Sequence, residues 1–323
     1  IHEIGHALGL KHPFESDRSN VTILNEYEDH SSFTAMSYEV DYAVLDGTFR
    51  SLDWQALAKL YGINKNYNSE DNIYEFDHYS TVLIIDGDGL DLIEASSSNE
   101  DIFLDLRPGQ HSFEGLKSEY ITDPKQLSIS FGSIIENVSS GFGDDYIIGN
   151  DYKNQISTGS GDDKVFAGEG ADVIASGSGS DVIDLSEIVP EIDIVIYTKE
   201  DVGTGFDTIY GFKQGIDGDY LDMGQTLIGD PSFLPLINSE NVPSGILNNS
   251  VFRVYGKDLN NHRDIEKAFG ENNLFKNLSM SIEISSLMIT SSSQDRGEMQ
   301  NLFFLNQSYS GLEISHLMRF VGD

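Results

Sequence analysis

The first twelve residues place three histidines and a glutamate at spacings that suit a metal ion. His2 and His6 are four positions apart, so a helix would put both imidazoles on one face. Gly9 permits the left-handed backbone at which such a helix can end, and His12 can then return to the same ion. Three protein ligands leave a coordination position open, which is typical of catalytic zinc. Glu3 is then the candidate base that takes a proton from a metal-activated water.

A second segment, residues 33–38, reads Phe-Thr-Ala-Met-Ser-Tyr. The order is typical of a Met-turn, in which Met36 forms an apolar floor under the metal, although ordinary core filling is the alternative role for a methionine. With Pro13 after the third histidine and Met-Ser-Tyr in the turn, the chain resembles the serralysins, secreted bacterial metalloproteases of the metzincin group. The resemblance implies that Tyr38 is a further, displaceable zinc ligand that stabilises the oxyanion once substrate binds.

The same resemblance implies that the sequence is an N-terminally truncated fragment. It opens one residue before His2, whereas in serralysins a sheet-bearing subdomain that forms the upper wall of the cleft precedes this helix. We therefore expect residues 1–62 to be the lower half of a catalytic domain. This half would end in a helix over Leu52–Tyr61 with Gly62 as its cap, and the fragment alone is expected to be inactive.

The charge balance narrows the possible partners. The 323 residues include 54 acids and 19 bases, for a net charge of −35, and no cysteine. Such a charge argues against nucleic-acid or anionic-membrane partners, and we find no apolar run long enough to cross a membrane. Dense carboxylates repel one another in a compact fold unless cations neutralise them. Repeated Asp beside Gly indicates calcium as that cation.

Residues 140–184 contain five nonamers in unbroken register, in the pattern of calcium-binding parallel β-rolls, the RTX repeats. Six residues of each nonamer form a turn and three form a strand. The middle strand residue points inward, and these residues are Ile147, Ile156, Val165, Ile174 and Ile183. The alternative, a flexible Gly/Asp linker, does not account for apolar residues at nine-residue spacing.

Hard calcium ions take oxygen ligands, which the turns supply as carbonyls and as a carboxylate at the sixth position. The candidate ligands are Ser140, Phe142, Gly143, Asp145, Thr158, Ser160, Gly161, Asp163, Ala167, Glu169, Gly170, Asp172, Ser176, Ser178, Gly179 and Asp181. The resemblance to serralysins implies a further site beside the partial nonamer at residues 86–93, made of Asn68, Glu70, Asn72, Asp86, Asp88 and Asp91.

Successive nonamers should fall on alternate sides of the roll, so their turns form two columns. The turns that begin at Ser140, Thr158 and Ser176 form one column, and those at Gly149 and Ala167 form the other. The nonamer register breaks after Asp184. We therefore expect Asp163 to lie between two intact turns and Asp172 to lack an intact neighbour.

The predicted fold class is α+β: the partial catalytic domain at 1–62, a mostly-β serralysin-like domain at 63–200 containing the roll, and a mixed β module at 201–323. Strands are expected at 81–85, 102–106, 127–131, 251–255, 279–284 and 301–305, with a short helix near 263–269. The last module resembles C-terminal parts of proteins exported by type I secretion. His30, His78, His111, His262 and His316 have no ligand spacing and are expected on the surface or in the core.

The implied function is a secreted, extracellular zinc endopeptidase that hydrolyses proteins or peptides and whose roll folds with several calcium ions. The alternative is a calcium-binding RTX adhesin or structural protein that carries an inactive protease remnant. All proposed zinc ligands and the base Glu3 are intact, which favours the enzyme.

Overall fold

The computed structural model describes residues 1–16, 18, 20–39, 47–76, 78–198, 201, 204–213 and 218–222, together with the backbone of five later strands. The chain forms two compact units. The first consists of Ile1–Ala95 and Glu100–Val138, and the second of Ser96–Asn99 and Ser139–Asp323. The described part is mostly β, and none of its helices is both long and apolar enough to cross a membrane.

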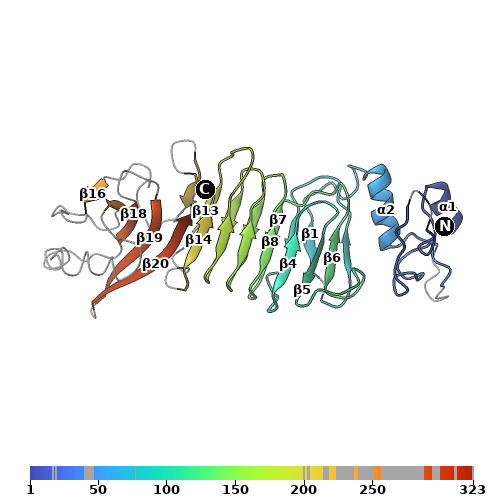
Figure 1. Ribbon diagram of the computed structural model, residues 1–323, viewed down its shortest axis with the longest axis horizontal. Coiled ribbons are helices and arrows are strands. Elements are labelled where there is room, and N and C mark those ends of the chain that lie inside the picture. The colour runs from blue at the N-terminus through green and yellow to red at the C-terminus, as the bar shows by residue number, and fades with distance from the viewer. Residues whose placement is uncertain are drawn as a thin grey trace. The chain divides into compact units, whose positions relative to one another are not determined.

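Two helices lie in the first unit (Figure 1). Helix α1 spans His2–Ala7, and the chain turns after it at Gly9, whose φ is +92°. Helix α2 spans Ser51–Tyr61 and ends at Gly62, whose φ is +77°. Both predicted helix ends are therefore confirmed. Leu57 of α2 packs with Leu10 and Met36 in a small core that joins the helix to the loops after α1.

The first unit also contains a small β structure. Its strands are β1 (Ile73–Glu75), β2 (Val82–Ile84), β3 (Leu92–Glu94), β4 (Ile102–Asp105), β5 (His111–Glu114) and β6 (Gln126–Ile129). Strand β1 runs parallel to β3, β5 lies antiparallel between β4 and β6, and β2 is parallel to β6. The strands predicted at 81–85, 102–106 and 127–131 are confirmed. Their side chains Ile84, Leu104, Leu127 and Ile129 have no exposed surface.

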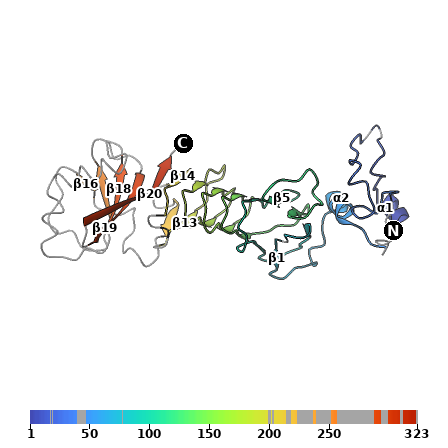
Figure 2. The ribbon, with the colours of Figure 1, turned by 90° about the horizontal axis from the view of Figure 1, so that it is seen from below.

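The second unit contains the β-roll, which we define as strands β8 to β15. They are β8 (Tyr146–Ile148), β9 (Gln155–Ser157), β10 (Lys164–Phe166), β11 (Val173–Ala175), β12 (Val182–Asp184), β13 (Ile194–Ile196), β14 (Asp207–Tyr210) and β15 (Tyr220–Asp222). Even-numbered strands pair in parallel with one another and odd-numbered strands do the same, which makes two sheets (Figures 1 and 2). Strand β7 (Asn137–Ser139) lies where the two units meet in sequence.

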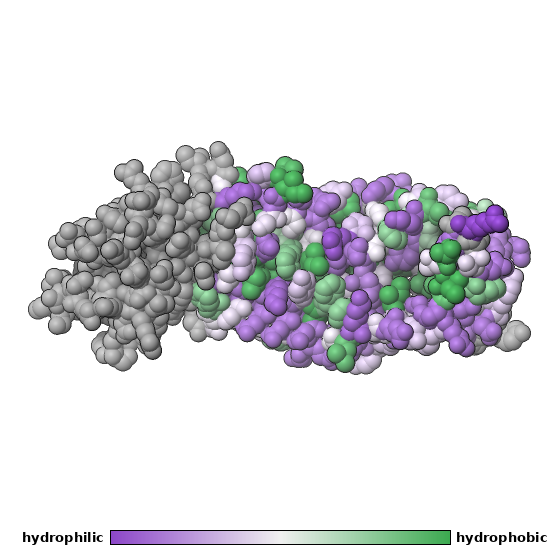
Figure 3. All heavy atoms as spheres, in the orientation of Figure 1, coloured by the Kyte–Doolittle hydropathy of each residue, from purple (hydrophilic) through white to green (hydrophobic). Residues whose placement is uncertain are grey.

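The inward-facing residues of the nonamers form the interior of the roll, as predicted. Ile147, Val165 and Ile174 have no exposed surface, and Ile156 and Ile183 are 1% exposed. Burial of each branched aliphatic side chain contributes about 1.5–3 kcal/mol to the stability of the roll. The face shown in Figure 3 is largely hydrophilic over the described residues, as expected for a chain of net charge −35.

The nonamer register breaks after Asp184, as predicted, but both sheets of the roll continue past that point. Strand β13 pairs in parallel with β11 and β15, and β14 pairs in parallel with β12. The connecting loops no longer have the nonamer length, but the strands keep their places. Strand pairing therefore does not depend on the nine-residue period of the sequence, because the loops can lengthen while neighbouring strands remain hydrogen-bonded.

The later strands are described by their backbone. They are β16 (Leu236–Asn238), β17 (Val251–Tyr255), β18 (Leu287–Ser292), β19 (Met299–Ser308) and β20 (Gly311–Val321). Strands β16 to β18 are parallel, β19 is antiparallel to both β18 and β20, and β20 runs parallel to β14. The strands predicted at 251–255 and 301–305 are confirmed. Those at 279–284, the helix near 263–269, and His262 lie outside the described residues, as does the side chain of His316.

Candidate metal centres

The three histidines of the N-terminal motif converge on one point. His2 and His6 come from α1, and the turn at Gly9 brings His12 back to them. The Nε2 atom of His12 lies 3.2 Å from Nε2 of His2 and 3.0 Å from Nε2 of His6. Within the described residues this is the one group of three metal-binding side chains whose ligand atoms lie within 4.8 Å of one another.

The outer ring nitrogens show how these imidazoles are protonated. Nδ1 of His2 donates to the carbonyl oxygen of Ala35 at 2.8 Å, and Nδ1 of His6 donates to that of Leu10 at 3.0 Å. A carbonyl can only accept, so the proton of each neutral ring is on Nδ1 and Nε2 carries a lone pair. Nδ1 of His12 lies 3.0 Å from Oε1 of Glu15. The three Nε2 atoms that converge could hold one metal ion, and acceptors such as those of Nδ1 in His2 and His6 orient histidine ligands.

Met36 packs against α1 and is 2% exposed. Its approach to α1 depends on Gly5, because a Cβ atom at position 5 would lie only 2.3 Å from Sδ of Met36. Met36 therefore packs against the helix that carries His2 and His6, and its place under a metal ion stays a prediction. Gly5 was missed by the sequence reasoning, which used only the ligand positions.

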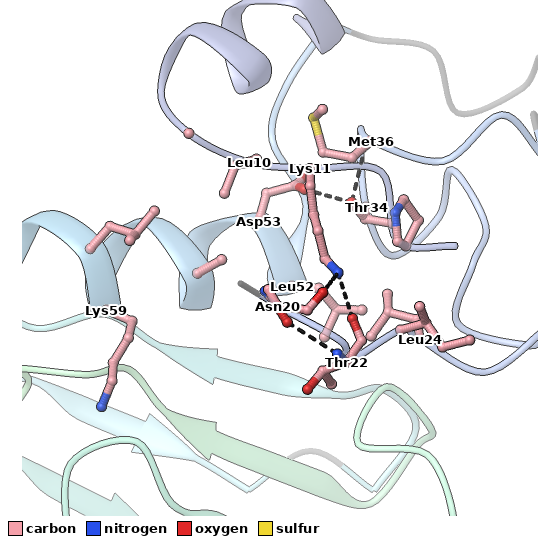
Figure 4. A pocket seen from close by; sticks show the side chains of 15 residues that line it. Leu10, Lys11, Asn20, Thr22, Leu24, Thr34, Met36, Leu52, Asp53 and Lys59 are labelled. Atoms are coloured by element: carbon pink, nitrogen blue, oxygen red, sulfur yellow. Dashed lines mark hydrogen bonds between the residues drawn. The ribbon is translucent and has the colours of Figure 1, made fainter. Parts of the chain in front are cut away.

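The Met-turn is held by Asp53 of α2, which is 2% exposed (Figure 4). Its Oδ1 accepts from the hydroxyl of Thr34 at 2.6 Å, and its Oδ2 accepts from the backbone N–H groups of Ala35 at 2.7 Å and Arg50 at 2.9 Å. One carboxylate thus caps the start of α2 and fixes the turn. Sequence reasoning had given Asp53 no role.

Tyr38 and Glu3 lie beside the cluster in different environments. The ring of Tyr38 stacks on His2 with centroids 5.3 Å apart, lies 4.6 Å from the ring of His12, and is 63% exposed. Glu3 is exposed on α1, next to His2. The structure therefore brings the phenol ring against two of the proposed ligands and leaves the carboxylate open to solvent.

A hollow of about 360 Å³ lies next to the Met-turn, lined by Leu10, Met36, Leu52 and Leu60 among others (Figure 4). Lys11 reaches along it. The Lys11 ammonium donates to the carbonyl oxygens of Glu15 at 2.5 Å, Asn20 at 2.9 Å and Thr22 at 2.7 Å. Lys11 therefore fixes the loop that follows His12.

In the roll, the sixth-position carboxylates form two continuous columns. The first contains Asp145, Asp163, Asp181 and Asp207. Each backbone N–H donates to Oδ1 of the next aspartate in the column, at 2.8, 3.0 and 2.9 Å. Backbone turns stack just as closely: Gly177 has a φ of +80°, and a Cβ there would lie 2.0 Å from the carbonyl oxygen of Gly159.

The second column contains Asn154, Asp172, Asp193 and Asp219. The same N–H to Oδ1 bonds join its members, at 2.7, 2.9 and 3.0 Å. Asp172 lacks an intact repeat turn on its C-terminal side, as predicted, but Asp193 takes that place in the column from a non-repeat loop. Asp193 and Asp219 were missed as column members, since they follow loops of irregular length.

Burial leaves these carboxylates short of partners. Asp163 is fully buried and Asp172 and Asp181 are 1% exposed. Their Oδ2 atoms have no hydrogen-bond partner among the described residues. Desolvation is the largest cause that raises their pKa values, to about 7 for Asp163, 8 for Asp172 and 6 for Asp181. Ionised side chains in this setting require a cation.

The comparisons with known proteins agree with this geometry. The family "RTX calcium-binding nonapeptide repeat" matches residues 148–183 in four copies. A serralysin of Proteus mirabilis is 33% identical over 181 residues, which cover 48% of this chain and 36% of the relative. Serralysin G of Dickeya chrysanthemi is 33% identical over 180 residues with the same coverage. This is a serralysin-like protein with RTX repeats. The matched part of the chain spans little more than a third of the length of these relatives.

The donor set of the RTX roll fits calcium. The orphaned Oδ2 atoms of Asp163, Asp172 and Asp181 are hard oxygen ligands, and the turns add backbone carbonyls. The carbonyls proposed from sequence belong to these stacked turns: Ser140, Phe142, Gly143, Thr158, Ser160, Gly161, Ala167, Glu169, Gly170, Ser176, Ser178 and Gly179. The side chain of Glu169 instead accepts from the backbone N–H groups of Ile188 at 2.8 Å and Val189 at 3.0 Å.

A second group of buried acids lies at residues 86–91 of the serralysin-like protein. Asp86 is 1% exposed and Asp91 is fully buried, with an Oδ2 atom that lacks a partner in the described part. Burial, together with Asp86 and Glu136, raises the pKa of Asp91 to about 7. The Asp91 N–H donates to Oε2 of Glu136 at 2.9 Å. Sequence reasoning missed Glu136, which lies 45 positions away.

The other residues proposed for this site differ in what they contribute. Asn72 donates its N–H to Oδ1 of Asp91 at 2.8 Å, and its amide also donates to the carbonyl oxygen of Glu70. Asp88 donates its N–H to Oδ1 of Asp86 at 3.1 Å. The amide of Asn68 donates to the carbonyl oxygen of Ile85 at 3.0 Å. Asp86 and Asp91 are thus the carboxylates that the fold buries together, with half-buried Glu136 beside Asp91.

Proposed function

We propose that the whole protein is a secreted zinc-dependent endopeptidase whose roll folds with calcium. The observation that carries the first part is the convergence of three Nε2 atoms, with the rings of His2 and His6 held from behind by backbone carbonyl oxygens. His2, His6 and His12 would hold zinc, and Tyr38 would be the displaceable fourth protein ligand. Several relatives of this chain are named serralysin, and "Metalloprotease AprA" of Pseudomonas entomophila is 30% identical over 182 residues.

Zinc in such a site supplies a Lewis acid that polarises a peptide carbonyl and lowers the pKa of water. The chain's own groups do the rest. Glu3 takes a proton from the attacking water and delivers it to the leaving amine. The hydroxyl of Tyr38, once it has swung away from its resting position, donates to the oxygen that gains negative charge. The carbonyl oxygens of Ala35 and Leu10 accept from Nδ1–H of His2 and His6, which keeps the lone pair of each ring on Nε2.

Zinc content tests the ligand assignment. Wild-type protein should bind one zinc ion, and His6→Ala should lose it, whereas His30→Ala should not. His30 is a matched control because its Nδ1 contacts Ser32 at 3.0 Å, apart from the cluster. Equal zinc in the wild type and in His6→Ala would rule out the site.

Peptide hydrolysis tests the base. Glu3→Gln should keep zinc but lose turnover, because the amide cannot accept the proton. Tyr38→Phe should keep zinc and lower kcat more than it raises KM, since the hydroxyl acts in the transition state. A zinc-loaded wild-type protein without hydrolysis of any peptide would favour the alternative, a calcium-binding roll protein with a protease remnant.

Calcium-dependent folding is the second part of the proposal. At low calcium the uncompensated carboxylates of the roll would oppose folding, and at high calcium the ions would join the turns. Such a chain could pass through a type I export machinery unfolded and fold outside the cell. Circular dichroism during a calcium titration should show a gain of β structure. No change between chelator and millimolar calcium would refute this part.

A further inference from the structure

The two columns of the roll end differently. The second column ends beside the loop at residues 185–193, which joins β12 to β13 without a Gly-x-Gly-x-Asp turn. Glu187 of this loop has a side chain that is 1% exposed. Its Oε1 accepts from Nζ of Lys213 at 2.9 Å and from the N–H of Glu191 at 2.6 Å. Its Oε2 has no partner among the described groups.

Lys213 is fixed to the last carboxylate of the same column. Its backbone N–H donates to Oδ2 of Asp219 at 2.7 Å, and its carbonyl oxygen accepts from the N–H of Asp219 at 2.7 Å. Asp219 in turn accepts from the N–H of Asp193 through Oδ1 at 3.0 Å. The backbone of Lys213 thus closes the ladder, and its side chain carries a positive charge back to Glu187.

A lysine acts on the carboxylates at the end of the second column, whereas the charges that act at the end of the first column are those of acids. Burial, Asp219 and Glu187 raise the pKa of Asp193 to about 7, and Lys213 opposes this rise. Lys213 also opposes the rise at Asp219. At the end of the first column, burial is the main cause that raises the pKa of Asp207 to about 8, and the charges that act on it are those of Asp181, Asp201 and Asp162. All three are acids and raise it further.

The start of the second column is also closed by side chains of the chain itself. Asn154 replaces the repeat aspartate, and its Oδ1 accepts from the N–H of Asn150 at 2.8 Å. Its Nδ2 donates to Oδ1 of Asn150 at 3.2 Å. The side-chain amide of Asn154 has an NH₂ donor as well as an oxygen, whereas an aspartate has two acceptor oxygens. The Asn154 turn is therefore neutral and forms a side-chain hydrogen bond within itself.

We propose that the Lys213 ammonium, paired with Glu187, is the built-in cation of the second column and holds β13 and β15 in the roll without a calcium ion at that end. The inference rests on calcium binding by the intact turns and goes beyond it. It divides the roll into a first column that needs calcium along its length and a second whose two ends are closed by Asn154 and Lys213.

Lys213→Met tests the proposal, because it keeps the length of the side chain and removes its charge. Lys164→Met is the matched control: Lys164 is an exposed residue of β10 in the same roll. In calcium titrations of the full chain followed by circular dichroism, Lys213→Met should raise the calcium midpoint roughly tenfold, which corresponds to about 1.4 kcal/mol, and the control should leave it unchanged. Calorimetry should count one more bound calcium ion in Lys213→Met, because the freed carboxylates become a site.

Thermal unfolding distinguishes a cation from a mere packing contact. Lys213→Met should unfold at a lower temperature than the wild type in limiting calcium and at nearly the same temperature in saturating calcium. An equal loss of Tm at both calcium levels would make Lys213 a structural contact only and overturn the proposal. So would a calcium midpoint no higher than that of the control.

A double variant covers the case in which Lys213→Met folds poorly. Adding Glu187→Gln removes the buried charge that Lys213 neutralises, so the double variant should return most of the way to the wild-type calcium midpoint. A midpoint equal to that of Lys213→Met would overturn the pairing. Asp163→Ala in the same titrations reports on calcium binding by the intact turns, so a failure of the calcium function is seen separately from a failure at Lys213.

Discussion

The carboxylate of Asp53 accepts the backbone N–H of Ala35 at 2.7 Å, and the carbonyl oxygen of the same residue accepts Nδ1–H of His2 at 2.8 Å. Helix α2 is therefore linked to a proposed zinc ligand through one residue, Ala35. The carboxylate of Asp53 is engaged by Thr34, Ala35 and Arg50. Its effect on the metal site must be on the orientation of His2.

We predict that Asp53→Ala weakens zinc binding by roughly 10–100-fold, the usual effect of losing second-shell support. Asp53→Asn should be much milder, because its amide can keep an oxygen toward Ala35 and Arg50 and its NH₂ group toward the hydroxyl of Thr34. Competition with a chromogenic chelator would measure both. Exposed Glu26→Gln serves as the charge control. Wild-type affinity in Asp53→Ala would show that His2 is not oriented through this path.

Gly5→Ala is predicted to destabilise the first unit by about 1–3 kcal/mol, because the new Cβ overlaps Sδ of Met36 and the side chain must move. Alanine favours a helix over glycine by about 1 kcal/mol, so the packing effect must exceed that gain. Urea unfolding would measure the change. In a Met36→Ala background the same substitution should cost nothing or stabilise, and an unchanged cost there would contradict the packing explanation.

Sequence patterns located the local parts of both centres. The four-residue spacing of His2 and His6 and the glycine at position 9 depend on one helix turn and one backbone conformation, so the sequence shows them directly. Asp53 contacts Thr34 across 19 positions, and Glu136 contacts Asp91 across 45. Such long-range contacts leave no period, and one sequence alone does not reveal them.

The end of the roll shows a second limit. Column neighbours are 18 positions apart at Asn154 and Asp172, but 21 apart at Asp172 and Asp193 and 26 apart at Asp193 and Asp219. A search for nonamers stops where the spacing changes. The ladder continues because each strand still offers its backbone groups and an inward aliphatic side chain, such as Val195, which is 1% exposed.

The corrected second column changes the expectation for its aspartates. Because only Asp163 lies between two intact repeat turns, the nonamer pattern alone predicts that Asp163→Ala weakens calcium-induced folding much more than Asp172→Ala. Since both residues are buried between two column neighbours and both have an orphaned Oδ2, we now predict calcium midpoints raised by similar factors. Exposed Asp151→Ala is the control, and calcium titration by circular dichroism is the measurement. A much larger effect at Asp163 would mean that Asp193 is no substitute for an intact turn.

His111 provides a pH test that is independent of any metal. Its ring is held between Oγ of Ser128 and Oε1 of Gln126, both at 3.0 Å. Burial lowers its pKa below the usual 6.5. As the pH falls below 6.5, the unfolded chain takes up a proton that the folded chain does not, so the folded state loses stability by at most about 1.4 kcal/mol per pH unit from this residue.

We predict that His111→Gln reduces the loss of stability between pH 7 and pH 5, because glutamine does not titrate and can still contact Ser128. At pH 7 the histidine is largely neutral in the unfolded chain as well as in the folded chain, so its titration matters little there. The stability of His111→Gln at pH 7 should still be lower than that of the wild type, since the replacement disturbs a buried hydrogen-bonded site. Urea unfolding of the chain at pH 5, 6 and 7 would measure both effects. His30→Gln should keep the wild-type pH dependence. An equally steep loss of stability in His111→Gln would mean that another group is responsible for it.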